Sequence, residues 1–73
     1  MNLYDIDHGH LVGRIESDRM ISRWGWSFSI EGYAVVDDLA ELGNEDAVVG
    51  TFIDGVFLNV YGQPMASIKG QLQ

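Results

Sequence analysis

The chain has no cysteine, a single proline and only four basic residues. No disulfide and no thiolate zinc cluster can therefore reinforce the modest core that 73 residues allow. Every apolar run is interrupted by Gly, Ser, Asp or Arg, well short of the roughly 20 residues that a membrane-spanning helix needs. The first residues are acidic where a secretory signal is basic and then apolar. These absences predict a cytoplasmic protein that does not associate with membranes.

Recognisable catalytic motifs are also missing. There is no thiol nucleophile, no serine lies in a G-x-S-x-G context, and no glycine spacing matches a phosphate-binding loop. The adjacent carboxylates of Asp37 and Asp38 would point apart at the start of a helix. We therefore predict that the chain is not an enzyme and uses no cofactor.

Negative charge dominates the composition, with 11 acidic residues and a formal net charge of −7. Such a chain repels phosphate backbones and anionic lipid, so general nucleic-acid binding is disfavoured. The charge is also uneven, because Arg14, Arg19 and Arg23 lie close together while most of the acids form one block without a base. We predict that this acidic block binds a protein partner with a basic surface. The block consists of Asp37, Asp38, Glu41, Glu45 and Asp46.

Other interpretations of the acidic block remain open. A run of carboxylates is often only a solvated turn that keeps a protein soluble. A calcium site is weakly supported, because the D-x-[DN]-x-[DN]-G loop pattern is absent. Carboxylates spread along one side of a protein can instead mimic a phosphate backbone and so inhibit a nucleic-acid enzyme.

The strongest local signal lies between Ala47 and Tyr61, where two runs of β-branched and aromatic residues meet at Asp54-Gly55. Asp-Gly between such runs favours a two-residue type I′ turn, because both residues tolerate positive φ. Residues 10–16 and 26–30 alternate like strands, and Ser17-Asp18 is a second plausible turn. The sequence shows no internal repeat.

These patterns predict an all-β or β-rich α+β fold, either a small antiparallel barrel of five to six strands or a bent sheet. The spacing of Asp38 and Glu41, followed by Gly43, predicts one short helix near residues 38–42. Residues 1–9 are expected to form a flexible arm or an edge strand, and residues 10–73 a single β-rich domain.

Apolar residues on both faces of several predicted strands imply barrel closure or burial against a partner. We therefore expect a homo-oligomer. If Phe57 and Tyr61 face water, these two side chains and Phe52 form the expected self-association patch.

The aromatic residues Trp24, Trp26 and Phe28 share one strand parity, and Tyr33 follows them. Exposed together, and helped by the three arginines, they would form a platform on which bases or sugars stack. The same parity is typical of a core face. We favour the core, because so small a chain needs its aromatic side chains inside.

Residues 5–10 contain the only side chains grouped like metal ligands. In an extended segment His8 and His10 would share one face, with Asp5 and Asp7 on the other, so the four would not converge. We expect a solvated arm without a metal ion.

The function predicted from these features is that of a small acidic, non-catalytic interaction module that self-associates and binds a basic protein partner. An inhibitor or a nucleic-acid mimic would fit this description. The alternative is a single-stranded nucleic-acid or carbohydrate binder that uses an aromatic sheet face.

Overall fold

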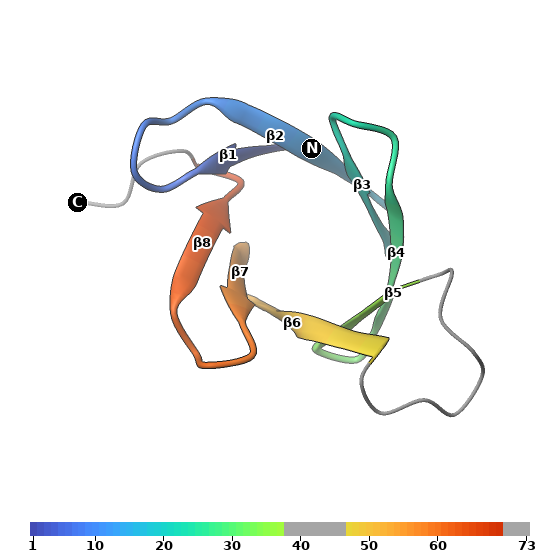
Figure 1. Cartoon of the computed structure of the whole chain (residues 1–73). Coiled ribbons are helices and arrows are strands. Elements are labelled where there is room, and N and C mark those ends of the chain that lie inside the picture. Colours follow the sequence, from blue (N-terminus) through green and yellow to red (C-terminus); the bar gives the residue numbers. More distant parts are fainter. Residues whose placement is uncertain (38–46, 70–73) are drawn as a thin grey trace.

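The computed structural model describes residues 1–37 and 47–69, which form a closed antiparallel barrel (Figure 1). Each strand pairs with its neighbours in the sequence, and β1 pairs with β8 to complete the ring. Closure leaves no strand edge exposed. The strands are β1 (Asn2–Asp5), β2 (Leu11–Glu16), β3 (Arg19–Ser22), β4 (Ser27–Glu31), β5 (Ala34–Asp37), β6 (Val48–Ile53), β7 (Val56–Asn59) and β8 (Pro64–Ser67).

The all-β, antiparallel prediction is confirmed, but the expected count of five to six strands is too low because the barrel has eight. The first nine residues include β1, which pairs on both sides and is neither an arm nor an edge strand. One of the additional strands arises at Gly32, where the chain reverses and Glu31 pairs with Ala34. The helix expected near residues 38–42 lies outside the described residues, and the part of the chain that is described contains no α-helix.

The predicted hairpin turns are present. Ile53 pairs with Val56 across Asp54-Gly55, where both turn residues have positive φ (53° and 79°), as a type I′ turn requires. Ser17-Asp18 also forms a two-residue turn, with Ser17 at φ 58°.

The barrel interior is the core. The interior of an eight-stranded barrel is narrow enough for side chains to fill it or to leave room for one small ligand. The fully buried apolar residues come from β1, β2, β3, β5 and β8, and larger half-buried side chains such as Phe28, Phe52 and Phe57 pack against them. The buried core residues are Leu3, Ile15, Met20, Val35 and Ala66.

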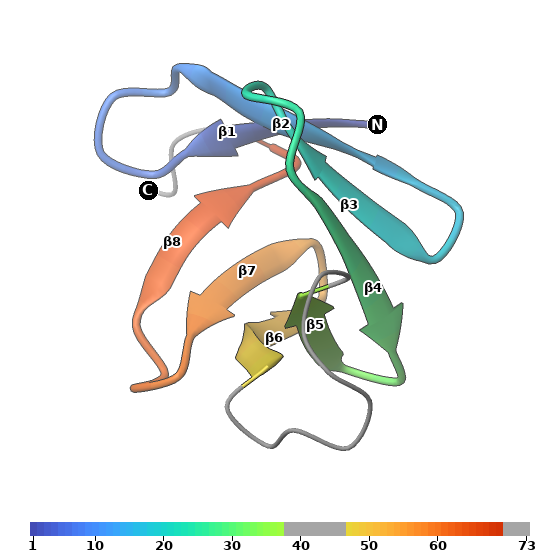
Figure 2. The ribbon, with the colours of Figure 1, turned by 45° about the vertical axis from the view of Figure 1, so that its right-hand side comes forward.

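The strand pairings of β1–β4 are repeated in β5–β8. Figure 2 shows the strands of both halves around the barrel. In the first half Leu3 pairs with Gly13, and the register then shifts at a bulge. In the second half Val35 pairs with Gly50, and the register shifts at the same place. Each bulge turns one valine toward the core, Val12 or its counterpart on β6.

The correspondence continues through both later hairpins. Gly13 pairs with Ser22 as Gly50 pairs with Asn59. The expectation that the chain has no internal repeat is therefore wrong at the level of structure. The repeat is hard to see in the sequence because few equivalent pairs are identical: Asp5 and Asp37, Val12 and Val49, Gly13 and Gly50, Gly25 and Gly62, Ser29 and Ser67, Ile30 and Ile68.

Candidate binding site at the barrel mouth

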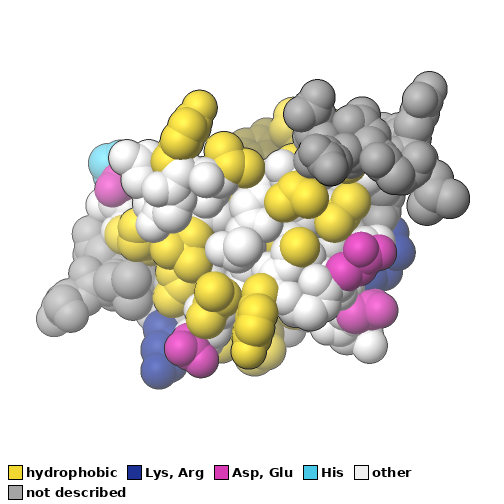
Figure 3. All heavy atoms as spheres, turned by 90° about the horizontal axis from the view of Figure 1, so that it is seen from below, with side chains coloured by type: hydrophobic (Ala, Val, Ile, Leu, Met, Phe, Trp, Pro, Cys, Tyr) yellow, Lys and Arg dark blue, Asp and Glu magenta, His cyan; other side chains and the backbone are white. Residues whose placement is uncertain are grey.

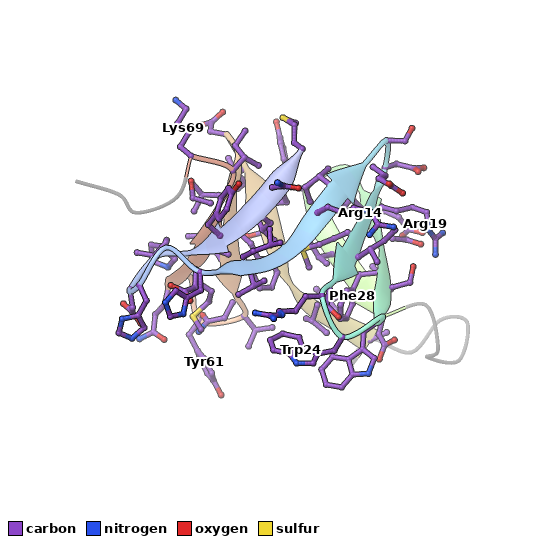
Figure 4. All side chains as sticks on the ribbon, turned by 90° about the horizontal axis from the view of Figure 1, so that it is seen from above. Arg14, Arg19, Trp24, Phe28, Tyr61 and Lys69 are labelled. Atoms are coloured by element: carbon purple, nitrogen blue, oxygen red, sulfur yellow. The ribbon has the colours of Figure 1, made fainter. Side chains whose placement is uncertain are left out.

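The two ends of the barrel are built differently. Because the strands alternate in direction, β1, β3, β5 and β7 all end at one end of the barrel, and β2, β4 and β6 end at the other. The connections that follow the second set of strands are two-residue turns, whereas those that follow the first set are longer. We call the end with the longer connections the barrel mouth. In Figure 4, Trp24 and Tyr61 project from this end, and Lys69 lies at the opposite one.

The β3–β4 connection at the mouth is held by the side chain and backbone of Ser22. The Trp26 amide donates to Ser22 Oγ at 3.0 Å, and the Ser22 amide donates to the Trp26 carbonyl at 2.8 Å. The Gly25 amide donates to the Ser22 carbonyl at 3.0 Å, and Gly25 has a φ of 91° that favours glycine.

The β7–β8 connection repeats this arrangement with Asn59. The Gln63 amide donates to Asn59 Oδ1 at 3.1 Å, and the Asn59 amide donates to the Gln63 carbonyl at 3.0 Å. The Gly62 amide donates to the Asn59 carbonyl at 2.9 Å, and the Tyr61 amide adds a bond to Asn59 Oδ1 at 2.9 Å. Trp24 and Tyr61 therefore occupy equivalent positions on two loops of the same design.

The tryptophans lie on the surface, which contradicts the expectation that they are in the core. Trp24 and Trp26 are 66% and 63% exposed, because both precede β4 and belong to the connection. Their ring centroids are 6.3 Å apart, and the Arg23 guanidinium lies 5.8 Å from the Trp24 ring. Phe28 packs against the core, as the parity argument predicts. Tyr33 is exposed but lies in a turn at the opposite end, so the predicted four-residue platform is not assembled.

The β1–β2 connection at the mouth is organised by Asp5. Its Oδ1 accepts hydrogen bonds from the His8 amide at 2.6 Å and the Gly9 amide at 2.8 Å. These bonds hold the pKa of Asp5 below its usual value, and the bond from the His8 amide has the largest effect. The rings of His8 and His10 stack at 5.6 Å. Within residues 1–37 and 47–69, no three His, Cys, Asp or Glu side chains gather as metal ligands do.

One residue of the acidic block, Asp37, is described, and it lies at the same end. Asp37 ends β5 at the position equivalent to Asp5 on β1. The rest of the block, Asp38, Glu41, Glu45 and Asp46, lies outside the described residues, between the mouth ends of β5 and β6 in the sequence.

The expected self-association residues are not brought together on the surface. Phe52 and Phe57 pair across β6 and β7, and both pack against the core. The predicted patch required Phe57 to face water, and Phe57 instead packs against the core. Tyr61 is 84% exposed at the mouth.

An apolar pocket of about 270 Å³ opens within the barrel wall near the mouth, and no sequence motif predicts it directly. Its walls come from β1, β2, β3, β7 and β8, and Asp5 is one of its few polar lining residues. The repeated Val-Gly pairs and the repeated Ser/Asn-x-x-Gly connections were the available signals, since they place the same loop twice at one end of a repeated barrel. Lining residues include Leu3, Val12, Met20, Phe57, Met65 and Ala66.

Fold and site together define an eight-stranded up-and-down barrel with a loop-lined mouth. Comparison with protein-family models, curated proteins and solved structures finds no match to this chain. In the part of the chain that the structure describes, no helix has the length and apolar character needed to cross a membrane.

Proposed function

We propose that this protein is a non-catalytic interaction module whose barrel mouth binds a basic protein partner. The observation that carries the proposal is the division of charge between the two ends. The connections at the mouth and the strand ends that flank them contain Arg23 as their single basic residue. They contain the acidic residues Asp5, Asp7 and Asp37, and in the sequence four more, Asp38, Glu41, Glu45 and Asp46, lie between β5 and β6.

The remainder of the barrel is nearly balanced in charge. Its acidic residues, Glu16, Asp18, Glu31 and Asp54, are offset by Arg14, Arg19 and Lys69. Arg14 and Glu16 form an ion pair at 2.8 Å. Nearly all of the net charge of −7 thus belongs to segments that start or end at the mouth. A field of this kind speeds the encounter with a positively charged surface and weakens as salt is added.

The aromatic residues at the mouth supply contacts that charge alone lacks. Trp24 and Tyr61 are exposed on loops already fixed by hydrogen bonds to Ser22 and Asn59, so little ordering remains to be done on binding. Tryptophan and tyrosine rings attract Lys and Arg side chains through cation–π interactions. A lysine- or arginine-rich surface therefore matches the mouth in two ways.

The test is affinity capture from the native lysate, with the captured proteins identified and quantified. We compare the wild type with the double variant Trp24→Ala/Tyr61→Ala and with Tyr33→Ala, which removes an equally exposed aromatic ring from the opposite end. Basic proteins should be captured by the wild type and by Tyr33→Ala, lost with the double variant and released by salt. Equal capture by all three, or a captured set without basic proteins, would contradict the proposal.

Self-association is a further part of this proposal, through the outer face of β6–β8. From Ala47 to Ile68 the only charged residue is Asp54. Val48 and Val60 are exposed there, and Figure 3 shows apolar side chains gathered over one face of the barrel. Such a surface favours burial against a second copy.

Sedimentation over a range of concentrations tests this part. Val48→Glu should shift the protein toward monomer, because it places a charge in the apolar face. Leu11→Glu is the matched control, since Leu11 occupies the position of Val48 in the first half of the barrel and is similarly exposed. A monomeric wild type, or equal effects of the two variants, would refute self-association through β6–β8.

Binding of single-stranded nucleic acid or carbohydrate is a second candidate, favoured by the exposure of the Trp24 and Trp26 rings beside Arg23. Stacking on exposed aromatic rings is how sequence-tolerant binders hold bases. Titration with oligothymidylate and with a neutral oligosaccharide should then quench or shift tryptophan fluorescence. Emission unchanged by both ligands would remove this candidate.

A further inference from the structure

The pocket near the mouth lies where one half of the barrel lacks a ring that the other half has. Where the first half of the barrel continues into the second, β4 pairs with β5, and Phe28 lies opposite Asp37. At the junction that closes the barrel, Ala66 on β8 pairs with Asp5 on β1. Ala66 therefore occupies the position of Phe28, and both Ala66 and Asp5 line the pocket.

The equivalent residues Gly13 and Gly50 also differ in whether an aromatic ring lies next to them. A Cβ built on Gly50 would lie 2.8 Å and 3.0 Å from two ring atoms of Phe57, so this ring covers Gly50. At the equivalent Gly13, the three nearest atoms all belong to the backbone of β3, and Gly13 lines the pocket. Met20 holds the position equivalent to Phe57 and carries no ring.

The pocket, which Phe57 lines from β7, thus lies where Ala66 and Met20 stand in place of the aromatic rings that Phe28 and Phe57 supply at the equivalent positions. Its walls are almost wholly apolar, and two of the lining residues, Met20 and Met65, have side chains that adapt to ligand shape. Mouths of β-barrels are common sites for small ligands. An aromatic ring is the group that the barrel itself uses at the equivalent place.

Asp5 adds a charge requirement. Its two hydrogen bonds from the backbone stabilise the carboxylate form, and both fall on Oδ1. The only other polar lining residue is Ser22, whose Oγ accepts the Trp26 amide. An anionic group entering the pocket would meet a carboxylate, whereas a protonated amine would be paired.

We propose that this pocket binds a compact ligand with one aromatic ring and a protonated amine, the ring lying beside Gly13 and Ala66 and the amine facing Asp5. This inference does not depend on the proposed partner binding at the mouth, because it concerns the interior of the barrel and not its loops.

The experiment uses phenethylamine as the probe, with 2-phenylethanol and phenylacetate as neutral and anionic analogues. Titration is followed by NMR at the side chains of Leu3 and Met20, which line the pocket. We expect saturable shifts with phenethylamine at a Kd on the order of 1 mM or tighter, as for other fragments of this size. Binding of 2-phenylethanol should be about tenfold weaker, and phenylacetate should not bind.

Two substitutions separate the ring and the charge. Ala66→Phe places in the pocket the side chain that Phe28 supplies in the other half, and it should abolish binding of phenethylamine and 2-phenylethanol. Ala34→Phe is the control on the outer face of β5 and should leave binding unchanged. Asp5→Asn should remove the preference for phenethylamine over 2-phenylethanol, while Asp54→Asn, at the turn end, should retain it.

If Ala66→Phe does not fold, the wild type and Asp5→Asn still test the proposal. Absence of saturable shifts in the wild type would overturn the proposal. Equal binding of the three probes, or a preference that survives Asp5→Asn, would overturn the assigned role of Asp5. Loss of partner capture with unchanged probe binding in Trp24→Ala/Tyr61→Ala would show that the two functions are separate.

Discussion

Gly13 and Gly50 occupy equivalent positions on β2 and β6, and at each of them the neighbouring strand leaves no room for a Cβ atom. A Cβ on Gly13 would lie 2.5 Å from the Ile21 carbonyl oxygen. A Cβ on Gly50 would clash with the Leu58 carbonyl oxygen and with the Phe57 ring. These glycines allow the close strand approach on which the repeated barrel depends.

Alanine at either glycine should therefore destabilise the barrel by about 1–3 kcal/mol, the usual cost of overpacking. Gly50→Ala should cost more than Gly13→Ala, because it meets a ring as well as the backbone. The measurement is urea unfolding of the two variants. Phe57→Leu should rescue part of the loss in Gly50→Ala but none in Gly13→Ala, and equal behaviour in both backgrounds would contradict the assigned contact.

The hairpins could be predicted from the sequence because their signals are local. Asp54-Gly55 and Ser17-Asp18 define their turns through the φ angles that their residues tolerate. The number of strands is underestimated from the sequence around Gly32. A glycine inside an alternating run is compatible both with a bulge and with a reversal of the chain. Only the pairing of Glu31 with Ala34 distinguishes these.

The site was harder to predict, because it depends on which ends of the strands meet. The histidines and the tryptophans are far apart in the sequence, and no local pattern relates them. The alternation of strand direction in an up-and-down barrel brings their connections to one end. The tryptophans are not in the core because the alternation that includes Phe28 begins at Ser27, and both Trp24 and Trp26 precede β4.

Asn59 and Ser22 should be interchangeable as loop-fixing residues. Asn59→Ala removes the acceptor for the Tyr61 and Gln63 amides and should lower the free energy of unfolding by about 1–2 kcal/mol. Asn59→Ser should recover much of this loss, because Ser22 makes the equivalent bond to Trp26. Thermal unfolding gives the stability, and amide hydrogen exchange at Gln63 reports the local bond. A serine variant no better than alanine would argue against the equivalence of the loops.

Ser17 and Asp54 are equivalent turn residues with nearly the same positive φ, 58° and 53°. Aspartate and asparagine tolerate this conformation better than serine does. We therefore expect Ser17→Asn to stabilise the protein by roughly 0.5 kcal/mol and Asp54→Ser to destabilise it by a similar amount. Chemical denaturation of the two variants measures both signs in one protein. Changes of the same sign would show that contacts outside the turns dominate.

The exposed tryptophans should give a red-shifted emission that acrylamide quenches readily in the folded state. Trp24→Phe and Trp26→Phe leave one indole each, and both single-tryptophan proteins should behave in this way because the side chains are similarly exposed. A blue-shifted emission that resists quenching in either variant would indicate that the remaining tryptophan is buried and would contradict this prediction.

Asp5 should make the stability of the barrel depend on pH under acidic conditions. Its pKa is lowered from 3.8 in the folded protein, chiefly by the His8 amide, so its stabilising contribution is complete above the unfolded value and is lost as the pH falls through the folded one. Asp5→Asn keeps an oxygen acceptor but cannot titrate. Its stability should therefore fall less steeply than that of the wild type below about pH 4. Asp54→Asn provides the comparison at the other end of the barrel, and equal slopes for wild type and Asp5→Asn would exclude this link between the mouth loop and the fold.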